Sequence, residues 1–147
     1  TIYICGNGGS AADAQHVVAE FVGRFSRERK ALAAVSLTTN TSILTAIGND
    51  YEFSKIFSRQ VEALMNSNDI LVGISTSGKS ENILNAIQAA KTIGAFTIGF
   101  TGTPGKPLSS LVDLCLKIPC SNTPHIQEAH IMTWHIIADL LEQRFVK

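Results

Sequence analysis

The stretch "ILVGISTSGKS", residues 70–80, joins an apolar run to a turn rich in glycine and hydroxyl groups. The run Ile70–Ile74 predicts a buried strand, and helical periodicity follows over Ser80–Ile93. A strand, a short polar turn and a helix in this order form the repeating unit of a parallel α/β sheet. We therefore expect this segment to be one such unit.

The same alternation continues on both sides of this segment. Further strands are predicted at Ile2–Cys5, Leu32–Leu37, Phe96–Phe100 and Leu114–Ile118, and further helices at Ser10–Arg24, Ser42–Ile47, Glu52–Met65 and His125–Phe145. No linker or internal repeat interrupts them, so residues 1–147 are expected to form one domain. The predicted fold class is α/β, a three-layer αβα sandwich with a five-stranded parallel sheet and flavodoxin-like or Rossmann-like winding.

Composition narrows the classes of function. The chain has 147 residues, of which 45% are hydrophobic and 16% charged, which favours a compact globule over disorder. Twelve basic and twelve acidic side chains cancel, so we expect neither nucleic acid nor a membrane as partner. Three cysteines without framework spacing predict a reducing, cytoplasmic location. Because the chain opens inside an apolar strand, we expect an N-terminal segment to be missing.

The first glycine loop, "GNGGSA" (residues 6–11), matches the G-x-G-x-x-A form of the dinucleotide-binding fingerprint. A dinucleotide site also needs an acidic residue at the end of the second strand, where it holds a ribose hydroxyl. The sequence there is "VSLTTN" (residues 35–40), which has no acid. A dinucleotide site is therefore disfavoured.

The second glycine loop, "GISTSGKS" (residues 73–80), matches the Walker A pattern of nucleoside triphosphatases. Gly73, however, lies inside an apolar run that predicts a strand, whereas the motif needs its first glycine in the loop. A P-loop enzyme also needs an aspartate after another strand to help hold Mg²⁺. Thr38, Thr101 and Pro119 occupy the corresponding positions here. A nucleotide site is disfavoured as well.

A phosphate monoester is the third candidate for the second loop. Ser75, Thr76, Ser77 and Ser80 place four hydroxyls within six residues, and small hydroxyls with backbone N–H groups can hold one phosphate. The simpler explanation is a capped helix with Ser80 as N-cap. Four hydroxyls exceed what capping requires, so we favour the phosphate.

Acid–base groups are spaced along two of the predicted helices. His16 and Glu20 are four residues apart and share one helix face, so they could bind a divalent metal ion or act as acid and base. An ordinary surface contact explains the same spacing. On the last helix, Gln127 and His135 lie within about 80° of one another, whereas His130 is turned about 140° from His135. Spacing alone leaves these alternatives open.

Four blocks of sequence together resemble the phosphoheptose isomerases of the sugar isomerase (SIS) domain superfamily. They are "CGNGGSAADAQHVVAE" (residues 5–20), "AIGND" (46–50), "GISTSGKSENI" (73–83) and "HIQEAHIMTWHIIADLLE" (125–142). The resemblance covers nearly the whole chain, as a single SIS domain that lacks the family's N-terminal helical arm. Four blocks in the right order are more specific than either glycine loop alone.

This resemblance implies an aldose–ketose isomerase that converts sedoheptulose 7-phosphate to D-glycero-D-manno-heptose 7-phosphate through an enediol. That reaction is the first step of ADP- or GDP-heptose synthesis for lipopolysaccharide, capsule or other surface glycans. The resemblance also implies a homotetramer with active sites at the subunit interfaces and one Zn²⁺ per subunit. It suggests a non-catalytic SIS-domain protein, such as an adaptor of a bacterial replication initiator, as the alternative.

The resemblance also implies the site residues. The catalytic pair would be Glu20 and His135, and the zinc ligands would be His16, Glu20, Gln127 and His135. The substrate-binding residues would be Asn7, Gly8, Gly9, Ser10, Glu20, Asn49, Asp50, Ser75, Thr76, Ser77, Ser80 and Gln127. The chain departs from the family pattern at Lys79, where relatives commonly carry a small polar residue, and at the pair Pro124–His125. Because the adaptor lacks the acid–base pair and this chain keeps it, the isomerase is favoured.

Overall fold

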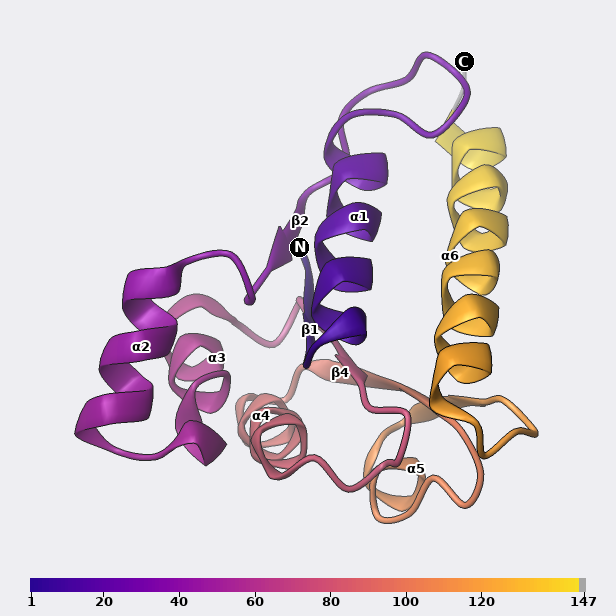
Figure 1. The fold of residues 1–147 in the computed structure, drawn as a ribbon. Helices are drawn as coiled ribbons and strands as arrows, with labels where there is room; N and C mark the ends of the chain where they lie inside the picture. Colours follow the sequence, from indigo (N-terminus) through magenta and orange to yellow (C-terminus); the bar gives the residue numbers. More distant parts are fainter. Residues whose placement is uncertain (146–147) are drawn as a thin grey trace.

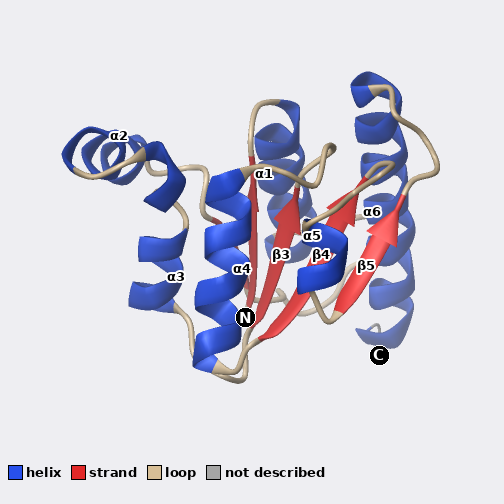
Figure 2. Cartoon of the chain, turned by 90° about the horizontal axis from the view of Figure 1, so that it is seen from below, coloured by secondary structure: helices blue, strands red, loops and turns tan. Residues whose placement is uncertain are grey.

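The computed structural model describes residues 1–145, which form one parallel sheet between two layers of helices (Figures 1 and 2). The strands are β1 (Ile2–Gly6), β2 (Ala34–Ser36), β3 (Ile70–Ile74), β4 (Phe96–Thr101) and β5 (Leu114–Lys117). The helices are α1 (Gly9–Val22), α2 (Thr41–Asp50), α3 (Ser58–Leu64), α4 (Glu81–Ile93), α5 (Leu108–Leu111) and α6 (Thr123–Phe145), with a 3₁₀ turn η1 (Phe53–Lys55).

The strand order is β2-β1-β3-β4-β5, and every neighbouring pair is parallel. This is the flavodoxin-like order, in which the chain winds in opposite directions from β1 and β3. Ligands in such sheets bind beyond the carboxyl ends of those two strands. The predicted fold class is confirmed, and the winding is the flavodoxin-like one of the two proposed.

Two hydrophobic clusters hold the layers together. One face of the sheet packs against α3, α4 and α5 through residues such as Val61, Ile83 and Leu108. The other face packs against α1 and α6 through residues such as Phe21 and Trp134. Figure 2 shows α3, α4 and α5 on the near side of the sheet and α1 and α6 behind it. The pair α1 and α6 carries the acid–base residues predicted from the sequence.

The central strand β3 explains why the Walker A pattern misleads. Gly73 pairs with Cys5 of β1 on one side and with Gly99 of β4 on the other, so it is a sheet residue. A side chain at Gly73 would also collide with Ile83 on α4, because a Cβ there would lie 2.8 Å from its methyl group. This glycine therefore serves helix–sheet packing, which supports the rejection of a P-loop.

Two elements differ from the sequence prediction. The single helix expected over Glu52–Met65 is wrong: the chain forms η1, bends, and resumes as α3. The bend lets the adjacent residues Ile56 and Phe57 both enter the core, at 2% exposure each, whereas neighbours on a continuous helix point 100° apart. Helix α5 was not predicted, because four residues are too few to show a period.

None of the helices within residues 1–145 is both long and apolar enough to cross a membrane.

Candidate active site

The glycine loop (residues 6–10) connects β1 to α1. Gly8 has a φ of 56°, in the left-handed region that favours glycine, and Ser10 is buried in the first turn of α1. The amides of Asn7 and Asn82 are paired, each nitrogen donating to the other's oxygen at 2.9 Å. Because Asn82 lies in the first turn of α4, this pair ties the loop after β1 to the helix after β3.

The serine turn (residues 75–80) connects β3 to α4. The hydroxyl oxygens of Ser75 and Ser80 lie 2.9 Å apart, and the Ser77 hydroxyl accepts a hydrogen bond from the backbone N–H of Lys79 at 3.2 Å. The Thr76 carbonyl accepts one from the N–H of Gly102 at 2.9 Å. Ser80 occupies the N-cap position of α4, yet its side chain makes no capping hydrogen bond. Helix capping therefore does not explain why residue 80 carries a hydroxyl group.

The two loops meet beyond the ends of β1 and β3, where the fold predicts a ligand. A hollow of about 300 Å³ lies there, lined by Asn7, Phe53, Ser54, Ser80, Glu81 and Asn82. The N-terminus of α4 opens into this region, and a helix N-terminus favours an anion. The geometry suits a phosphate group.

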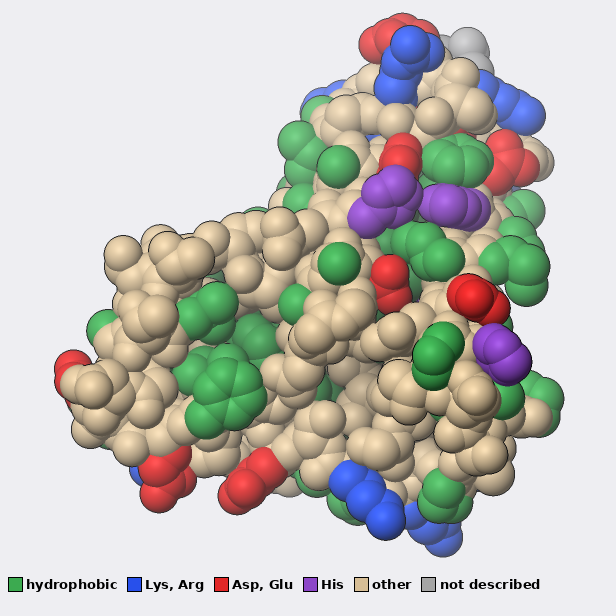
Figure 3. Space-filling view, viewed as in Figure 1, with side chains coloured by type: hydrophobic (Ala, Val, Ile, Leu, Met, Phe, Trp, Pro, Cys, Tyr) green, Lys and Arg blue, Asp and Glu red, His purple; other side chains and the backbone are tan. Residues whose placement is uncertain are grey.

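Helices α1 and α6 bring three acid–base side chains together. His16 Nε2 lies 3.1 Å from His135 Nε2 and 3.3 Å from Glu20 Oε1. One ligand atom from each residue lies within 4.8 Å of the other two. Figure 3 shows histidine side chains gathered on the exposed face over α1 and α6, with an acidic side chain beside them. We call these three residues the His–Glu–His cluster.

The cluster fits a divalent metal ion. Tetrahedral zinc, with bonds of about 2.0–2.1 Å to nitrogen or oxygen, spaces its ligand atoms about 3.3 Å apart. The observed separations of 3.1 and 3.3 Å agree with that spacing. Two imidazoles and one carboxylate are also a common donor set for zinc. Of the predicted ligands, these three therefore share one site.

Gln127 lies near the N-terminal end of α6, whereas His135 lies in the middle of the helix. A Cβ placed on Gly9 would lie 2.6 Å from Nε2 of Gln127, so the amide packs directly against the glycine loop. Eight residues separate Gln127 from His135, which is about 12 Å along the helix. This position favours contact with substrate at the glycine loop, and the role of Gln127 as a metal ligand stays a prediction.

Asn49 and Asp50 end helix α2, where both are exposed and the Asn49 amide donates to the Asp50 carboxylate at 2.9 Å. Asp50 lines a separate hollow together with Tyr51 and Arg59. Figure 1 shows α2 on the far side of the molecule from α6, so within one chain these two residues lie away from the His–Glu–His cluster. Their role in substrate binding stays a prediction.

The remaining histidine of interest on α6 is a core residue. His130 is fully buried, its ring packs edge-on against Phe100, and its Nε2 lies 3.3 Å from the Thr101 carbonyl. Burial lowers the pKa of His130, and the bond to Thr101 opposes this only in part. The neutral ring thus serves packing, as its angular separation from His135 indicated.

The comparisons with known proteins show the family of the chain. A SIS domain model matches residues 1–102. The phosphoheptose isomerase of Geotalea daltonii is 56% identical over 143 residues, which cover 97% of this chain and 74% of that protein. The phosphoheptose isomerase of Nitratiruptor sp. is 54% identical over 144 residues, covering 98% and 77%. The chain belongs to the phosphoheptose isomerase family.

Solved structures of phosphoheptose isomerases share the fold. The enzyme of Neisseria gonorrhoeae superposes with a TM-score of 0.91 at 47% identity, covering 97% of this chain and 76% of that one. The enzyme of Francisella tularensis gives a TM-score of 0.93 at 40% identity with the same coverage. The family resemblance inferred from the four sequence blocks is therefore confirmed, and the alternative of a non-catalytic adaptor is not favoured.

Sequence reasoning missed three side chains at these sites. Asp13 lies one turn before His16 on the same face of α1, and burial raises its pKa while His16 opposes that shift. Asn82 holds Asn7, and Phe25 stacks on the ring of His135 with ring centres 5.4 Å apart. The i, i+3 spacing of Asp13 and His16 was a usable signal. The other two contacts join distant segments, and the sequence carries no signal for them.

Proposed function

We propose that this chain interconverts sedoheptulose 7-phosphate and D-glycero-D-manno-heptose 7-phosphate, with Glu20 and His135 as the proton-transfer groups. As a phosphoheptose isomerase family member at 54–56% identity, the chain is an aldose–ketose isomerase. The meeting of Glu20, His16 and His135 between α1 and α6 is the observation that carries the assignment of the reacting groups. Their ligand atoms are close enough to act on one sugar carbon and its neighbour.

The phosphate of the substrate would bind at the serine turn. The hydroxyls of Ser75, Ser77 and Ser80 and the N-terminus of α4 supply hydrogen bonds and a favourable dipole for an anion. The glycine loop lies beside them, and His16 follows Gly9 by seven residues, about 10 Å along α1. A long sugar phosphate would thus place its phosphate and its carbonyl at opposite ends of the site.

The isomerisation moves one proton between carbons and another between oxygens. A base removes a proton from C1 of the ketose to give an enediol, and an acid delivers a proton to C2 of the aldose. The hydroxyl proton on O1 moves to O2 in the same conversion. Ligand atoms of Glu20 on α1 and His135 on α6 lie within 4.8 Å of one another, and these two groups would share the transfers.

His16, Glu20 and His135 would hold a zinc ion, one per subunit, with Gln127 as the further predicted ligand. A zinc ion there would supply Lewis-acid polarisation of the substrate carbonyl. His16 would take no part in the proton transfers. Its role would be to complete the donor set, with its Nε2 atom 3.1 Å from that of His135.

Helix α6 supports assembly into a homotetramer with active sites at the subunit interfaces. Met132, Ile136 and Leu140 recur every four residues on one face of α6 and are 59%, 53% and 56% exposed. A helix that is apolar on two sides is usually buried on both. An apolar hollow of about 230 Å³ also lies between α6 and strands β3 to β5, lined by residues such as Ile98 and Ile137.

The biological setting proposed for the reaction is the synthesis of nucleotide-activated heptose for surface glycans. The substrate is a phosphorylated metabolite, and all three cysteines are free thiols, which supports the predicted cytoplasmic location. Membership in the phosphoheptose isomerase family supports the pathway.

Turnover of sedoheptulose 7-phosphate tests this proposal. Purified protein supplied with zinc should produce an aldose 7-phosphate, seen as new anomeric signals in the proton NMR spectrum. Fructose 6-phosphate, a shorter ketose phosphate, serves as the matched substrate and should turn over at least tenfold more slowly. If folded, zinc-loaded protein gives no aldose product, the isomerase assignment is wrong and the non-catalytic alternative is favoured.

A further inference from the structure

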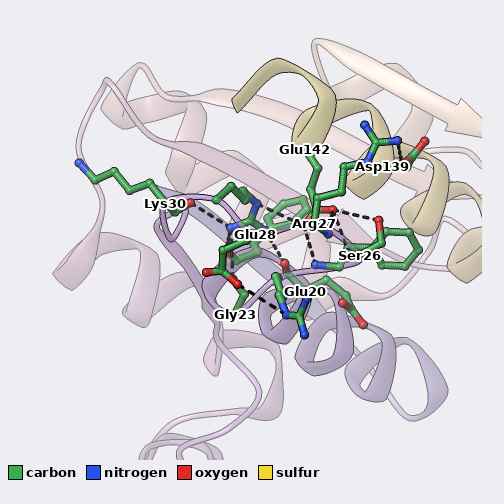
Figure 4. A network of polar contacts seen from close by, with 12 residues as sticks. Glu20, Gly23, Ser26, Arg27, Glu28, Lys30, Asp139 and Glu142 are labelled. Carbon is green, nitrogen blue, oxygen red and sulfur yellow. Dashed lines mark hydrogen bonds and ion pairs between the residues drawn. The ribbon is translucent and has the colours of Figure 1, made fainter. Parts of the chain in front are cut away.

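A buried carboxylate fastens the loop after α1 to the end of α6. Glu142, in the last turns of α6, is fully buried. Its two oxygens accept hydrogen bonds from the backbone N–H groups of Phe25, Ser26 and Arg27 at 2.7, 2.9 and 2.8 Å, and from the Ser26 hydroxyl at 3.2 Å. Figure 4 shows this network. We call residues 24–30, which cross from α1 to α6, the strap.

An arginine of the strap closes the end of α1. The Arg29 guanidinium is 1% exposed and forms an ion pair with Glu142 at 3.5 Å. It donates to the carbonyl oxygens of Glu20 at 2.6 Å, Phe21 at 2.9 Å and Gly23 at 3.3 Å. These are carbonyls at the C-terminal end of the helix, which lack helical partners and favour a cation. Arg29 therefore fixes the turn of α1 that carries Glu20.

The strap also reaches His135. The Phe25 ring stacks on the His135 ring, with centres 5.4 Å apart and an angle of 26° between the planes. His135 also contacts His16, whose ring meets it edge-on with ring centres 5.3 Å apart. His135 thus contacts an aromatic ring of the strap and a ring of α1. An exposed imidazole without such contacts would sample several rotamers.

The strap is attached at each end to a residue of the predicted acid–base pair. Its Phe25 touches His135, its Arg29 holds the backbone of Glu20, and Glu142 holds both parts of the strap. Two further ion pairs of the strap, Arg27 with Asp139 at 3.8 Å and Arg24 with Glu28 at 4.0 Å, are solvent-exposed and contribute little. The buried ion pair of the strap, Arg29 with Glu142, therefore lies at the turn of α1 that carries Glu20.

We propose that Phe25, Arg29 and Glu142 are positioning residues. They hold the His135 ring and the turn of α1 that carries Glu20 in the relative positions that proton transfer requires. This inference rests on the proposed roles of Glu20 and His135. Phe25 acts through the face of the His135 ring, and Glu142 acts through Phe25 and Arg29. Phe25 also packs against the hydrophobic cluster between α1, α6 and the sheet, so the test needs a readout that a purely structural role would not change.

The test compares Phe25→Leu, which keeps an apolar side chain, with Phe25→Tyr, which keeps the stacked ring. In Phe25→Leu, kcat for sedoheptulose 7-phosphate should fall about 10- to 100-fold with KM nearly unchanged, because the phosphate contacts are intact. Phe25→Tyr should retain kcat within about threefold of the wild type. Phe96→Leu, a matched change at an exposed phenylalanine of β4, should leave kcat unchanged.

An NMR readout separates failure of this inference from failure of the proposed function. The ring current of Phe25 shifts the Cε1–H signal of His135, so that signal should move in Phe25→Leu and stay near its place in Phe25→Tyr. If the wild type does not turn over the substrate, the proposed function fails, and the His135 signal still decides the positioning role. A folded Phe25→Leu protein with an unchanged His135 signal, or with wild-type kcat, would overturn the inference.

The Glu142→Gln variant provides an independent test, because Glu142 lies on α6 and holds the backbone of the strap. It keeps the shape of the side chain but replaces one acceptor oxygen by a donor, so the N–H groups on that side lose their partner. If this variant folds, kcat should fall with KM unchanged, as for Phe25→Leu. If it does not fold, Phe25→Leu and Phe25→Tyr decide the question.

Discussion

His16 is the residue whose only proposed task is to hold a metal ion. It contributes one imidazole to the His–Glu–His cluster, and removing one of three ligands of this kind should reduce zinc affinity strongly. We expect about one zinc per chain in the wild type and less than a tenth of that in His16→Ala after dialysis, measured by metal analysis. His125→Ala, which removes an exposed histidine at the start of α6, should keep the wild-type content. Equal zinc in all three proteins would refute the ligand assignment.

Residues that lie close in sequence were found from the sequence, and contacts between distant segments were not. The i, i+4 spacing of His16 and Glu20 made them candidates, and the structure places them together. The approach of His135 to that pair, 119 residues away, was available only through the family resemblance. Glu142 reads as an ordinary surface carboxylate near the end of an amphipathic helix. Its burial depends on three backbone N–H groups of the strap, which no sequence pattern encodes.

At the scale of elements, Asp113 links the start of β5 to α4 and β4. Its carboxylate accepts hydrogen bonds from the Thr97 hydroxyl at 2.7 Å, from Lys91 at 2.9 Å and from the Thr97 N–H at 2.9 Å. These bonds, together with the charge of Lys91, hold the pKa of Asp113 at about 2, although burial opposes them. The interaction joins two strands and a helix at the edge of the sheet.

This depressed pKa predicts a stability change in acid. A carboxyl whose pKa is lower in the folded state stabilises the fold above its unfolded pKa, here near 3.8, and that contribution is lost as the pH falls through about 2. The free energy of unfolding, measured with urea between pH 7 and pH 2, should fall less steeply below pH 4 in Asp113→Asn than in the wild type. Asp113→Asn should also be less stable at pH 7. Identical acid profiles would contradict the role assigned to Asp113.

Long periodic elements were predicted closely, whereas short or bent ones were not. β3 was predicted with its exact bounds, because a buried parallel strand is a continuous apolar run. The expected strand Leu32–Leu37 is shorter, at Ala34–Ser36, since it lies at the edge of the sheet and has a partner on one side only. The break between η1 and α3 occurs where two adjacent side chains, Ile56 and Phe57, are both buried in the core. The local periodicity of the sequence does not predict that both are buried.

For the whole molecule, the apolar stripe of α6 should mediate assembly. Ile136 lies in the middle of the stripe, and a glutamate there would bury a charge in any interface formed through it. Light scattering after gel filtration should give a tetramer for the wild type and a smaller species for Ile136→Glu. Ser110→Glu, at an exposed position of α5, should keep the wild-type mass. A wild-type monomer, or an Ile136→Glu tetramer, would contradict assembly through α6.

The proposed mechanism depends on Glu20 acting directly in proton transfer. The most direct measurement is kcat for sedoheptulose 7-phosphate in Glu20→Gln, with zinc content determined on the same sample. We predict a fall of about 10²- to 10⁴-fold, the usual contribution of a general acid or base, while Glu62→Gln on the opposite face of the sheet keeps wild-type kcat. A Glu20→Gln protein that turns over at the wild-type rate would contradict the central claim, whatever its zinc content.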